Sequence, residues 1–265
     1  MTNKTALVTG ASDGIGLEFC KILAGKGYNI ILVARRKNKL NKIAKSLSQQ
    51  HKNIICTVLS NDLSKPQAAQ KLFQSTIKNE LKVDLLINNA GLLQNGFFTE
   101  LDLSTQEKMI TVNILALTSL THLFANDMAS RGGGYILNVA SLAAWLPIPN
   151  QNVYAATKAY VLSFSTALHN EMRAAGNGVS VTALCPGYTA TKMMNNPDQG
   201  AKLSVPAGML QSAQDVAERG IKACLAGKPM AVPGFANRAT AAITHLFPKM
   251  MLANTAGSFY RKNLE

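Results

Sequence analysis

Residues 4–16 read KTALVTGASDGIG, and this stretch decides the fold. Its first part, Lys4–Thr9, is short, apolar and rich in β-branched residues, which is typical of a buried strand. Glycines follow at positions 10, 14 and 16. Apolar residues then recur at helical spacing, namely Ile15, Phe19, Ile22 and Leu23. The stretch therefore predicts a strand, a glycine-rich turn and a helix in direct succession.

A strand that leads through glycines into a helix presents the free amides of the helix N-terminus to a phosphate. The spacing here is GxxxGxG rather than GxGxxG, but glycines permit close backbone approach in both patterns. The alternative is an ordinary turn between a strand and a helix, without a ligand. We favour a phosphate site, whose candidate residues are Gly10, Ser12, Asp13, Gly14, Ile15 and Gly16.

The second predicted strand, Asn29–Ala34, is followed by two arginines, Arg35 and Arg36. An NAD-binding protein usually has Asp or Glu near this point, about 20 residues past the glycines, to hold the ribose hydroxyls. No carboxylate stands here, and guanidinium groups form paired, charge-assisted hydrogen bonds with a 2′-phosphate. The sequence therefore favours NADP(H) over NAD(H) as the cofactor. The alternative is that both arginines cover the start of the next helix.

Strand-like and helix-like segments continue to alternate along the chain. Further strands are predicted at 54–59, 83–87, 135–140, 179–184 and 230–232, with helical patterns between most of them. This alternation is typical of an α/β fold with a doubly wound parallel sheet and helices on both faces. We expect residues 1–265 to form a single domain of this kind.

Polar residues stand at the ends of several strands, where open parallel sheets bind their ligands. Asp62-Leu63 follows the third strand, and its carboxylate is placed to accept a hydrogen bond from an adenine amino group. Asn88-Asn89-Ala90-Gly91 follows the fourth strand, and Ser141 follows the fifth. Asn113 lies in a long apolar helix predicted over 109–128, where a polar amide is either a satisfied core group or a functional one.

The segment Asn150–Ser165 holds Tyr154 and Lys158 four residues apart among alanines, which are strong helix formers. On a helix the two side chains share one face, about 6 Å apart along the axis. An ammonium favours a neighbouring phenolate, so we expect the pKa of Tyr154 to fall from about 10 toward neutrality. Such a tyrosine exchanges a proton with a substrate oxygen. The alternative is a packed tyrosine beside a solvated lysine, because this spacing occurs by chance in many helices.

Two later segments lack a clear pattern. Residues 188–212, after the sixth strand, are rich in Thr, Met, Asn and Gly, which predicts a mobile lid over a substrate. The C-terminal extension, about 237–265, mixes apolar residues with Lys249, Arg261 and Lys262 and shows no repeat. Contact of this extension with an anionic membrane surface is a minor alternative.

The chain has 265 residues, 47% of them hydrophobic, and a net charge of +13. That charge suits nucleic acid, an anionic membrane, or a phosphorylated or acidic partner. No nucleic-acid-binding motif accompanies the basic residues, so we expect no nucleic acid. No apolar run reaches about 18 residues, and the N-terminal run is too short for an export signal. The four cysteines are widely spaced, which predicts free thiols, no metal site and a cytoplasmic location.

Taken together, these residues resemble the short-chain dehydrogenases/reductases, a family of Rossmann-fold, NAD(P)-dependent oxidoreductases, over about Lys4–Val232. The matching motifs are the TGxxxGIG turn of Thr9–Gly16, Asp62, the NNAG run of Asn88–Gly91, the tetrad Asn113, Ser141, Tyr154 and Lys158, and Pro186-Gly187. Each motif alone is weak, but the ordered set is highly specific. The resemblance implies a seven-stranded parallel sheet in the order 3-2-1-4-5-6-7.

The resemblance also implies a role for each member of the tetrad. Tyr154 transfers the substrate proton, Lys158 lowers the tyrosine pKa and holds the nicotinamide ribose, and Ser141 binds the substrate oxygen. Asn113 holds a water that links Lys158 to solvent.

Cofactor contacts are implied for Asn89, Ala90, Gly91, Pro186, Gly187, and Thr189 or Thr191. Homodimers or homotetramers, formed by the helices near 109–128 and 154–173, are implied as well.

Three functions compete. The preferred one is NADPH-dependent reduction of a small or medium apolar ketone or aldehyde, with an apolar rim of Leu92, Leu93, Trp145 and Leu146. The second is reduction of a 3-oxoacyl-CoA or 3-oxoacyl-carrier protein, which the positive charge suits; the C-terminal extension is also similar to that of long-chain 3-ketoacyl reductases. The third is a cofactor-binding sensor or membrane-associated scaffold, against which the complete tetrad argues.

Overall fold

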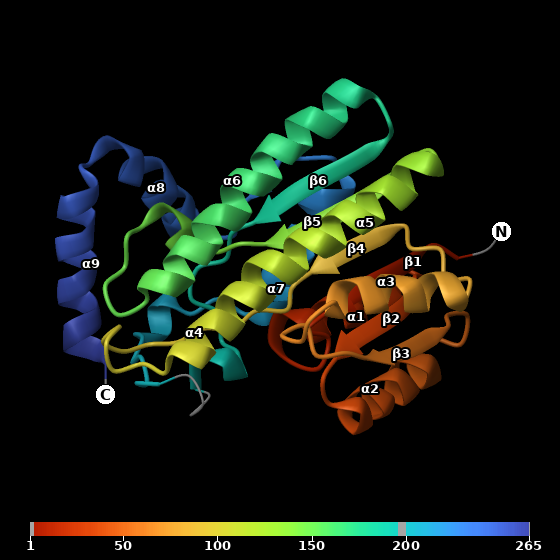
Figure 1. Cartoon of the computed structure of the whole chain (residues 1–265), viewed down its shortest axis with the longest axis horizontal. Coiled ribbons are helices and arrows are strands. Elements are labelled where there is room, and N and C mark those ends of the chain that lie inside the picture. The colour runs from red at the N-terminus through yellow and green to blue at the C-terminus, as the bar shows by residue number, and fades with distance from the viewer. Residues whose placement is uncertain (1–2, 196–199, 265) are drawn as a thin grey trace.

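A computed structural model describes residues 3–195 and 200–264 and contains one seven-stranded sheet (Figure 1). The strands are β1 (Thr5–Thr9), β2 (Asn29–Ala34), β3 (Cys56–Ser60), β4 (Leu85–Asn88), β5 (Gly134–Val139), β6 (Val179–Leu184) and β7 (Met230–Ala231). Neighbouring strands are parallel, in the order β3-β2-β1-β4-β5-β6-β7. The predicted fold class and strand order are confirmed.

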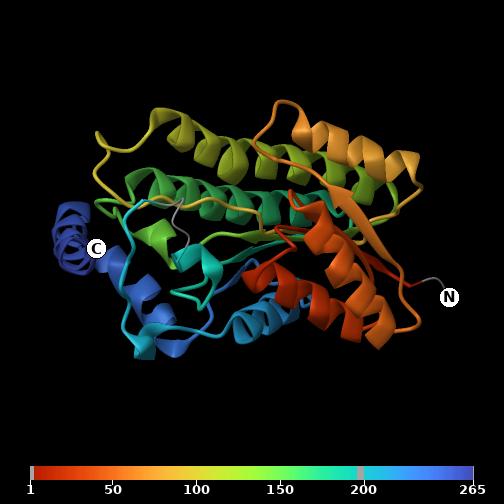
Figure 2. The same cartoon turned by 90° about the horizontal axis from the view of Figure 1, so that it is seen from below.

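Helices cover both faces of the sheet, as Figure 2 shows from below. One layer contains α1 (Gly14–Gly25), α2 (Lys37–Gln50) and α7 (Ala213–Leu225). The other contains α3 (Ala68–Lys78), α4 (Leu103–Ile110), α5 (Leu117–Ser130) and α6 (Asn152–Ala175). Each layer packs its own apolar cluster against the sheet, around Phe19 on the first face and Phe124 on the second. Burial on both faces explains why the central strands are continuously hydrophobic.

The helix predicted over 109–128 is longer than expected and is not regular. It begins with α4 at Leu103, where the Asp102 carboxylate accepts a hydrogen bond from the Thr105 amide at 3.1 Å. Between α4 and α5 the backbone forms a π-helical turn, η1 (Thr111–Ala116), which contains Asn113. The run Leu103–Ser130 is long and apolar enough to cross a membrane, but half of its most apolar window is buried within the fold. It is therefore built like the core helix of a globular domain.

The C-terminal extension forms two helices, α8 (Phe235–Ile243) and α9 (Lys249–Asn263), although its sequence shows no repeat. Both lie beyond the carboxyl ends of the strands (Figure 1). Helix α9 buries Gly257 and Tyr260 against the domain. A Cβ on Gly257 would lie 3.0 Å from the Pro149 ring, so this glycine permits the close approach. The helix is fixed by a few tertiary contacts rather than by a regular apolar stripe, which is why its pattern is weak.

The segment 188–212, predicted as a lid, has one backbone bridge between its own two ends and two that attach it to the rest of the domain. Thr189 pairs with Gln211, Gly200 with Asn95, and Leu203 with Leu264. Residues 196–199 of this segment lie outside the described residues. The bridges place the segment beside α9, and its mobility stays a prediction.

Candidate active site

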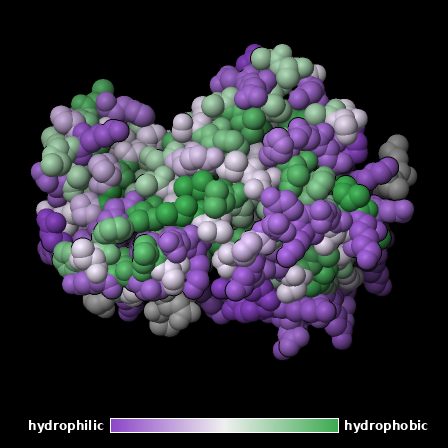
Figure 3. All heavy atoms as spheres, in the orientation of Figure 1, coloured by the Kyte–Doolittle hydropathy of each residue, from purple (hydrophilic) through white to green (hydrophobic). Residues whose placement is uncertain are grey.

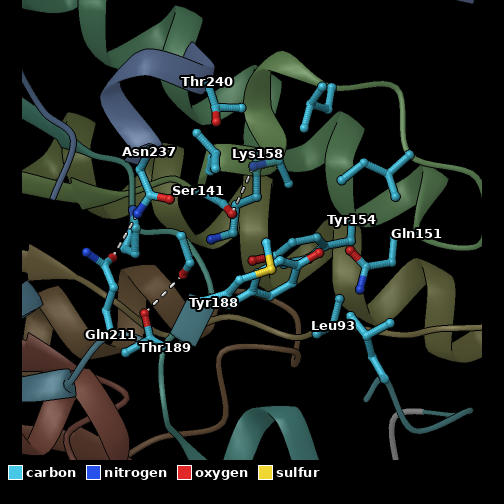
Figure 4. A pocket seen from close by; sticks show the side chains of 18 of the residues that line it. Leu93, Ser141, Gln151, Tyr154, Lys158, Tyr188, Thr189, Gln211, Asn237 and Thr240 are labelled. Carbon is cyan, nitrogen blue, oxygen red and sulfur yellow. Dashed lines mark hydrogen bonds between the residues drawn. The ribbon is translucent and has the colours of Figure 1, made fainter. Parts of the chain in front are cut away.

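A cavity of about 720 Å³ opens at the carboxyl ends of the central strands (Figure 4). One wall carries Ser141, Tyr154 and Lys158, together with the loop that follows β6. The opposite wall comes from the C-terminal helices, including Thr240 of α8 and Phe259 of α9. The cavity therefore brings three of the four predicted catalytic residues, all but Asn113, together with a segment for which the sequence suggested no site.

Ser141, Tyr154 and Lys158 form one group at the end of β5 and the start of α6. Ser141 follows β5 in an extended conformation, and its hydroxyl lies near Tyr154 and lowers the pKa of that phenol. Lys158 is buried; its Nζ donates to the Val139 carbonyl at 2.8 Å and lies 5.7 Å from the centroid of the Tyr154 ring. A hydroxyl, a phenol and an ammonium thus converge on one part of the cavity wall.

The acid–base properties of the pair differ from the expectation. Burial raises the pKa of Tyr154 and outweighs the effect of Ser141, so the predicted fall toward neutrality is wrong for the protein without its ligands. Burial lowers the pKa of Lys158 to about 8. Helical spacing alone could not give these directions, because they follow from the low polarity around both groups.

Asn113 lies behind this group and cross-links three segments. Its Oδ1 accepts from the Leu92 amide at 2.8 Å, and its Nδ2 donates to the Leu92 carbonyl and to Thr157 Oγ1. A Cβ on Gly91 would lie 3.4 Å from Asn113 Oδ1 and 3.6 Å from Lys158 Nζ. Gly91 therefore lies beside both Asn113 and Lys158, and the water between them stays a prediction.

The glycine turn leaves its backbone amides open for a ligand. Gly10 and Gly14 have positive φ angles of 68° and 51°, which side chains rarely tolerate. A Cβ on Gly14 would lie 2.9 Å from Thr191 Cγ2, so Thr191 faces the turn across a narrow gap. Helix N-termini bind phosphates, so the amides of this turn are the candidate site for the pyrophosphate of a dinucleotide, with Thr191 in contact with the turn.

The run Asn88–Gly91 is fixed to the turn through Thr9. The amides of Asn89 and Ala90 both donate to Thr9 Oγ1, at 2.9 and 3.0 Å, and Asn89 Nδ2 donates to the Thr9 carbonyl. Asn89 and Gly91 line the cavity, whereas Ala90 packs against the core on the α5 side of the sheet.

The predicted adenosine contacts gather beyond β2 and β3. Arg36 donates to Ser12 Oγ at 3.0 Å and to the Asp13 carboxylate at 3.1 Å. Lys39, which sequence reasoning missed, contacts the same carboxylate at 2.5 Å. Burial alone would raise the pKa of Asp13, but hydrogen bonds from Lys39 and Arg36 outweigh it and lower the pKa. Arg36 and Lys39 are therefore both held by Asp13 beside the glycine turn.

Asp62 lies near Arg35 at the same end. Its Oδ1 accepts from the amide and the hydroxyl of Ser64, at 3.1 and 2.8 Å. These bonds and the Arg35 charge lower its pKa against the opposing effect of burial. The second carboxylate oxygen remains available to an adenine donor, while Leu63 is buried.

The loop after β6 separates the two threonines that the sequence could not distinguish. Pro186, Gly187, Thr189 and Thr191 all line the cavity. Thr189 Oγ1 donates to the Gly187 carbonyl at 3.0 Å, whereas Thr191 faces Gly14. Thr191 is thus at the phosphate end and Thr189 nearer the catalytic group.

Sequence reasoning also missed the wall formed by α9. Its cavity-lining residues are Leu252, Thr255, Ala256, Phe259 and Tyr260. Their spacing of three and four residues was a helical signal, but it includes a threonine and an alanine and so did not stand out as an apolar stripe.

Comparison with known proteins agrees with this geometry. A family model described as short chain dehydrogenase matches residues 4–202. An uncharacterized oxidoreductase of Staphylococcus saprophyticus is 30% identical over 223 residues, 84% of this chain and 92% of the relative. A very-long-chain 3-oxoacyl-CoA reductase of Mus musculus is 33% identical over 221 residues, 82% of this chain and 67% of the relative.

Solved structures are similar over nearly the whole chain. A short-chain dehydrogenase from Sphingobium yanoikuyae in complex with NADPH is 28% identical, with a TM-score of 0.81 over 92% of this chain and 93% of the other. A short chain dehydrogenase/reductase from Burkholderia phymatum in complex with NAD is 25% identical, with the same TM-score and coverage.

Replacing Lys158 by Met should stabilise the ligand-free protein at pH 7. The lysine pKa falls from 10.5 to about 8, which corresponds to about 3 kcal/mol of destabilisation. Loss of the bond to Val139 offsets about 1 kcal/mol of the gain. Lys158 loses its proton near pH 8 in the folded wild type and near pH 10.5 in the unfolded chain. The free energy of unfolding of the wild type therefore rises between these two pH values, and the stability advantage of Lys158→Met becomes smaller.

Urea unfolding at pH 7 and pH 9.5 would measure this difference. The matched control is Lys42→Met on the exposed side of α2, for which no pH-dependent difference is expected. If Lys158→Met and the wild type differed in free energy of unfolding by the same amount at both pH values, the lowered pKa of Lys158 would be contradicted.

Proposed function

Because the chain belongs to the short-chain dehydrogenase/reductase family, we propose that it is an NADPH-dependent reductase of ketones or aldehydes. The observation that carries the proposal is the placement of Ser141, Tyr154 and buried Lys158 together at the wall of a largely apolar cavity. The bound nicotinamide supplies the hydride. The substrate is a small-molecule carbonyl compound, or the corresponding alcohol in the reverse direction.

The residues then act on the carbonyl oxygen. Ser141 accepts from the Ala143 amide at 3.1 Å, which fixes its oxygen and leaves its proton for a partner in the cavity. Tyr154 is protonated at neutral pH because burial raises its pKa, so it is ready to donate a proton to the developing alkoxide. Lys158, with a pKa of about 8, is mostly charged at pH 7 and stabilises the phenolate that proton transfer leaves behind.

NADP(H) is favoured over NAD(H) by the cations at the adenosine end. Arg36 and Lys39 are held by Asp13 within reach of the turn, and no carboxylate occupies positions 34–36. A 2′-phosphate adds charge that these cations bind, whereas a 2′-hydroxyl does not.

A 3-oxoacyl thioester is the second candidate substrate. Several relatives are named very-long-chain 3-oxoacyl-CoA reductase, and the net charge of +13 suits a phosphorylated or acidic carrier. The apolar side chains of α9 offer a surface for an acyl chain. Acetoacetyl-CoA reduced far better than simple ketones would favour this candidate over the first.

A reducing, cytoplasmic location fits the thiols. All four cysteines are free, and burial raises the pKa of Cys185 and Cys224 to about 12, so neither thiol is reactive.

Replacing Tyr154 by Phe should lower kcat by roughly a thousandfold, because the proton donor is lost. NADPH binding, measured by thermal shift, should stay within about twofold. The matched control is Tyr28→Phe, at the opposite end of the sheet, which should leave both values unchanged. Turnover by Tyr154→Phe within a few-fold of the wild type would contradict the mechanism.

Replacing Arg36 by Ala should weaken NADP+ binding roughly tenfold or more and leave NAD+ binding nearly unchanged, since only the 2′-phosphate needs a charge-assisted bond. Titration calorimetry with both nucleotides would measure the ratio. Lys42→Ala, which removes an exposed cation on helix α2, is the control. If Arg36→Ala weakened the binding of NADP+ and NAD+ equally, a contact between Arg36 and the 2′-phosphate would be excluded.

We further propose a homodimer or homotetramer in which the outer faces of α4–α5 and α6 meet their symmetry mates. Apolar side chains gather across this face, whereas hydrophilic ones cover α2 and α3 (Figure 3). Leu103 and Leu115 are 66% and 58% exposed there. Such large exposed apolar side chains are typical of subunit interfaces.

Replacing Leu115 by Glu should convert the oligomer to smaller species, because a charge would be buried at the interface. Light scattering would measure the mass. Leu246→Glu, at an exposed site near the C-terminal helices, should leave the mass unchanged. A wild type that is monomeric would reject the interface outright.

A further inference from the structure

A network of four polar side chains lines part of the cavity. Tyr188 and Tyr260 hydroxyls are 3.0 Å apart, and Tyr260 is hydrogen-bonded to Gln151 Oε1 at 3.0 Å. Gln151 Nε2 contacts Asn95 Oδ1, and Asn95 Nδ2 donates to the Ala201 carbonyl at 2.9 Å. All four side chains line the cavity.

The direction of every hydrogen bond in this network follows from the bond at its end, between Asn95 and the Ala201 carbonyl. The Ala201 carbonyl only accepts, so the Asn95 group facing it must be Nδ2. Asn95 Oδ1 then faces Gln151, which turns Gln151 Nε2 toward Asn95 and Oε1 toward Tyr260. Tyr260 gives its single proton to Gln151, so Tyr188 must donate to Tyr260.

Because Tyr188 donates its only proton to Tyr260, its oxygen can only accept a hydrogen bond from a group in the cavity. Asn95, Gln151 and Tyr260 are only 4%, 5% and 3% exposed, so water does not compete freely for their bonds. Burial also raises the pKa of Tyr188 and of Tyr260, so both keep their protons at neutral pH. A ligand group that meets the Tyr188 oxygen must therefore donate a proton to it.

Tyr188 is also close to the catalytic group. Tyr154, Tyr188 and Tyr260 pack in one apolar cluster, and besides burial the nearby Tyr188 helps to raise the pKa of Tyr154. Figure 4 shows both Tyr154 and Tyr188 reaching into the same cavity. A substrate whose carbonyl oxygen meets Tyr154 therefore brings its neighbouring atoms to Tyr188.

We propose that Tyr188 is a specificity-determining residue that accepts a hydrogen bond from the substrate. Tyr260 is the positioning residue, because it accepts the hydrogen bond that uses the only Tyr188 proton. The proposal rests on the proposed carbonyl reduction. The substrate class it selects is a carbonyl compound with a hydroxyl or N–H group a few bonds from the carbonyl carbon. A group of the same size that can only accept hydrogen bonds, such as an ether, is disfavoured, because its oxygen and the Tyr188 oxygen would face each other without a proton between them.

The test uses hydroxyketones with the hydroxyl two, three or four carbons from the carbonyl, each paired with its methyl ether. For the best hydroxyketone, wild-type kcat/KM should exceed that of the ether by roughly tenfold. Tyr188→Phe should bring this ratio close to one. Tyr260→Phe should also lower the ratio, chiefly by raising kcat/KM for the ether, because the freed Tyr188 proton can then be donated to the ether oxygen.

The last result separates the proposal from a merely structural role, since damage to the fold would lower both values together. Tyr135→Phe, at the amino end of β5, is the matched control and should keep the wild-type ratio. A wild-type ratio near one for all pairs, or a ratio unchanged in Tyr188→Phe, would overturn the proposal. If the wild type reduces none of the ketones but oxidises NADPH with another carbonyl class, the specificity inference fails while the proposed function stands; no turnover with any carbonyl rejects the proposed function itself.

Discussion

The structure depends on the close approach of helix α1 to the end of strand β1. A Cβ on Gly16 would overlap the Gly10 carbonyl and lie 2.5 Å from Asn89 Nδ2, so no side chain fits there. The same junction holds β4, because Asn89 and Ala90 donate to Thr9. One crowded point thus sets the positions of the phosphate-binding amides, the residues after β4 and, through Gly91, the space beside Lys158. Cofactor and catalytic groups are positioned together because the same backbone atoms support both.

Burial, rather than simple pairing, sets the electrostatics of the catalytic group. The ammonium of Lys158 is costly where it lies, and its bond to the Val139 carbonyl repays only part of that cost. Tyr154 meets the same low polarity and keeps its proton. A negative charge that forms on a substrate oxygen or on the phenol would relieve the buried cation. The site is therefore better matched to the charge distribution of the reaction than to its resting state, which is the general requirement for catalysis.

Much of the fold was predictable because it depends on local patterns. The strand at Asn29–Ala34, the glycine turn and the placement of Ser141 at a strand end follow from period and turn chemistry. The π-helical turn around Asn113 was not predictable, since Thr111–Ala116 reads as ordinary helix and the extra residue in the turn is set by bonds to Leu92 and Thr157. Lys39 was missed because its role depends on Asp13, a residue 26 positions away. The direction of the Tyr154 pKa was wrong because spacing carries no information on desolvation.

The two ends of the cavity are built by different means, yet they are mechanically joined. Sheet ends supply the proton-transfer group, while α8 and α9 supply another part of the lining. Gln151 connects them: its side chain accepts from Tyr260, and its backbone carbonyl accepts from the Ala155 amide in the first turn of α6. The same residue therefore links the part of the cavity formed by α9 to the first turn of the helix that carries Tyr154.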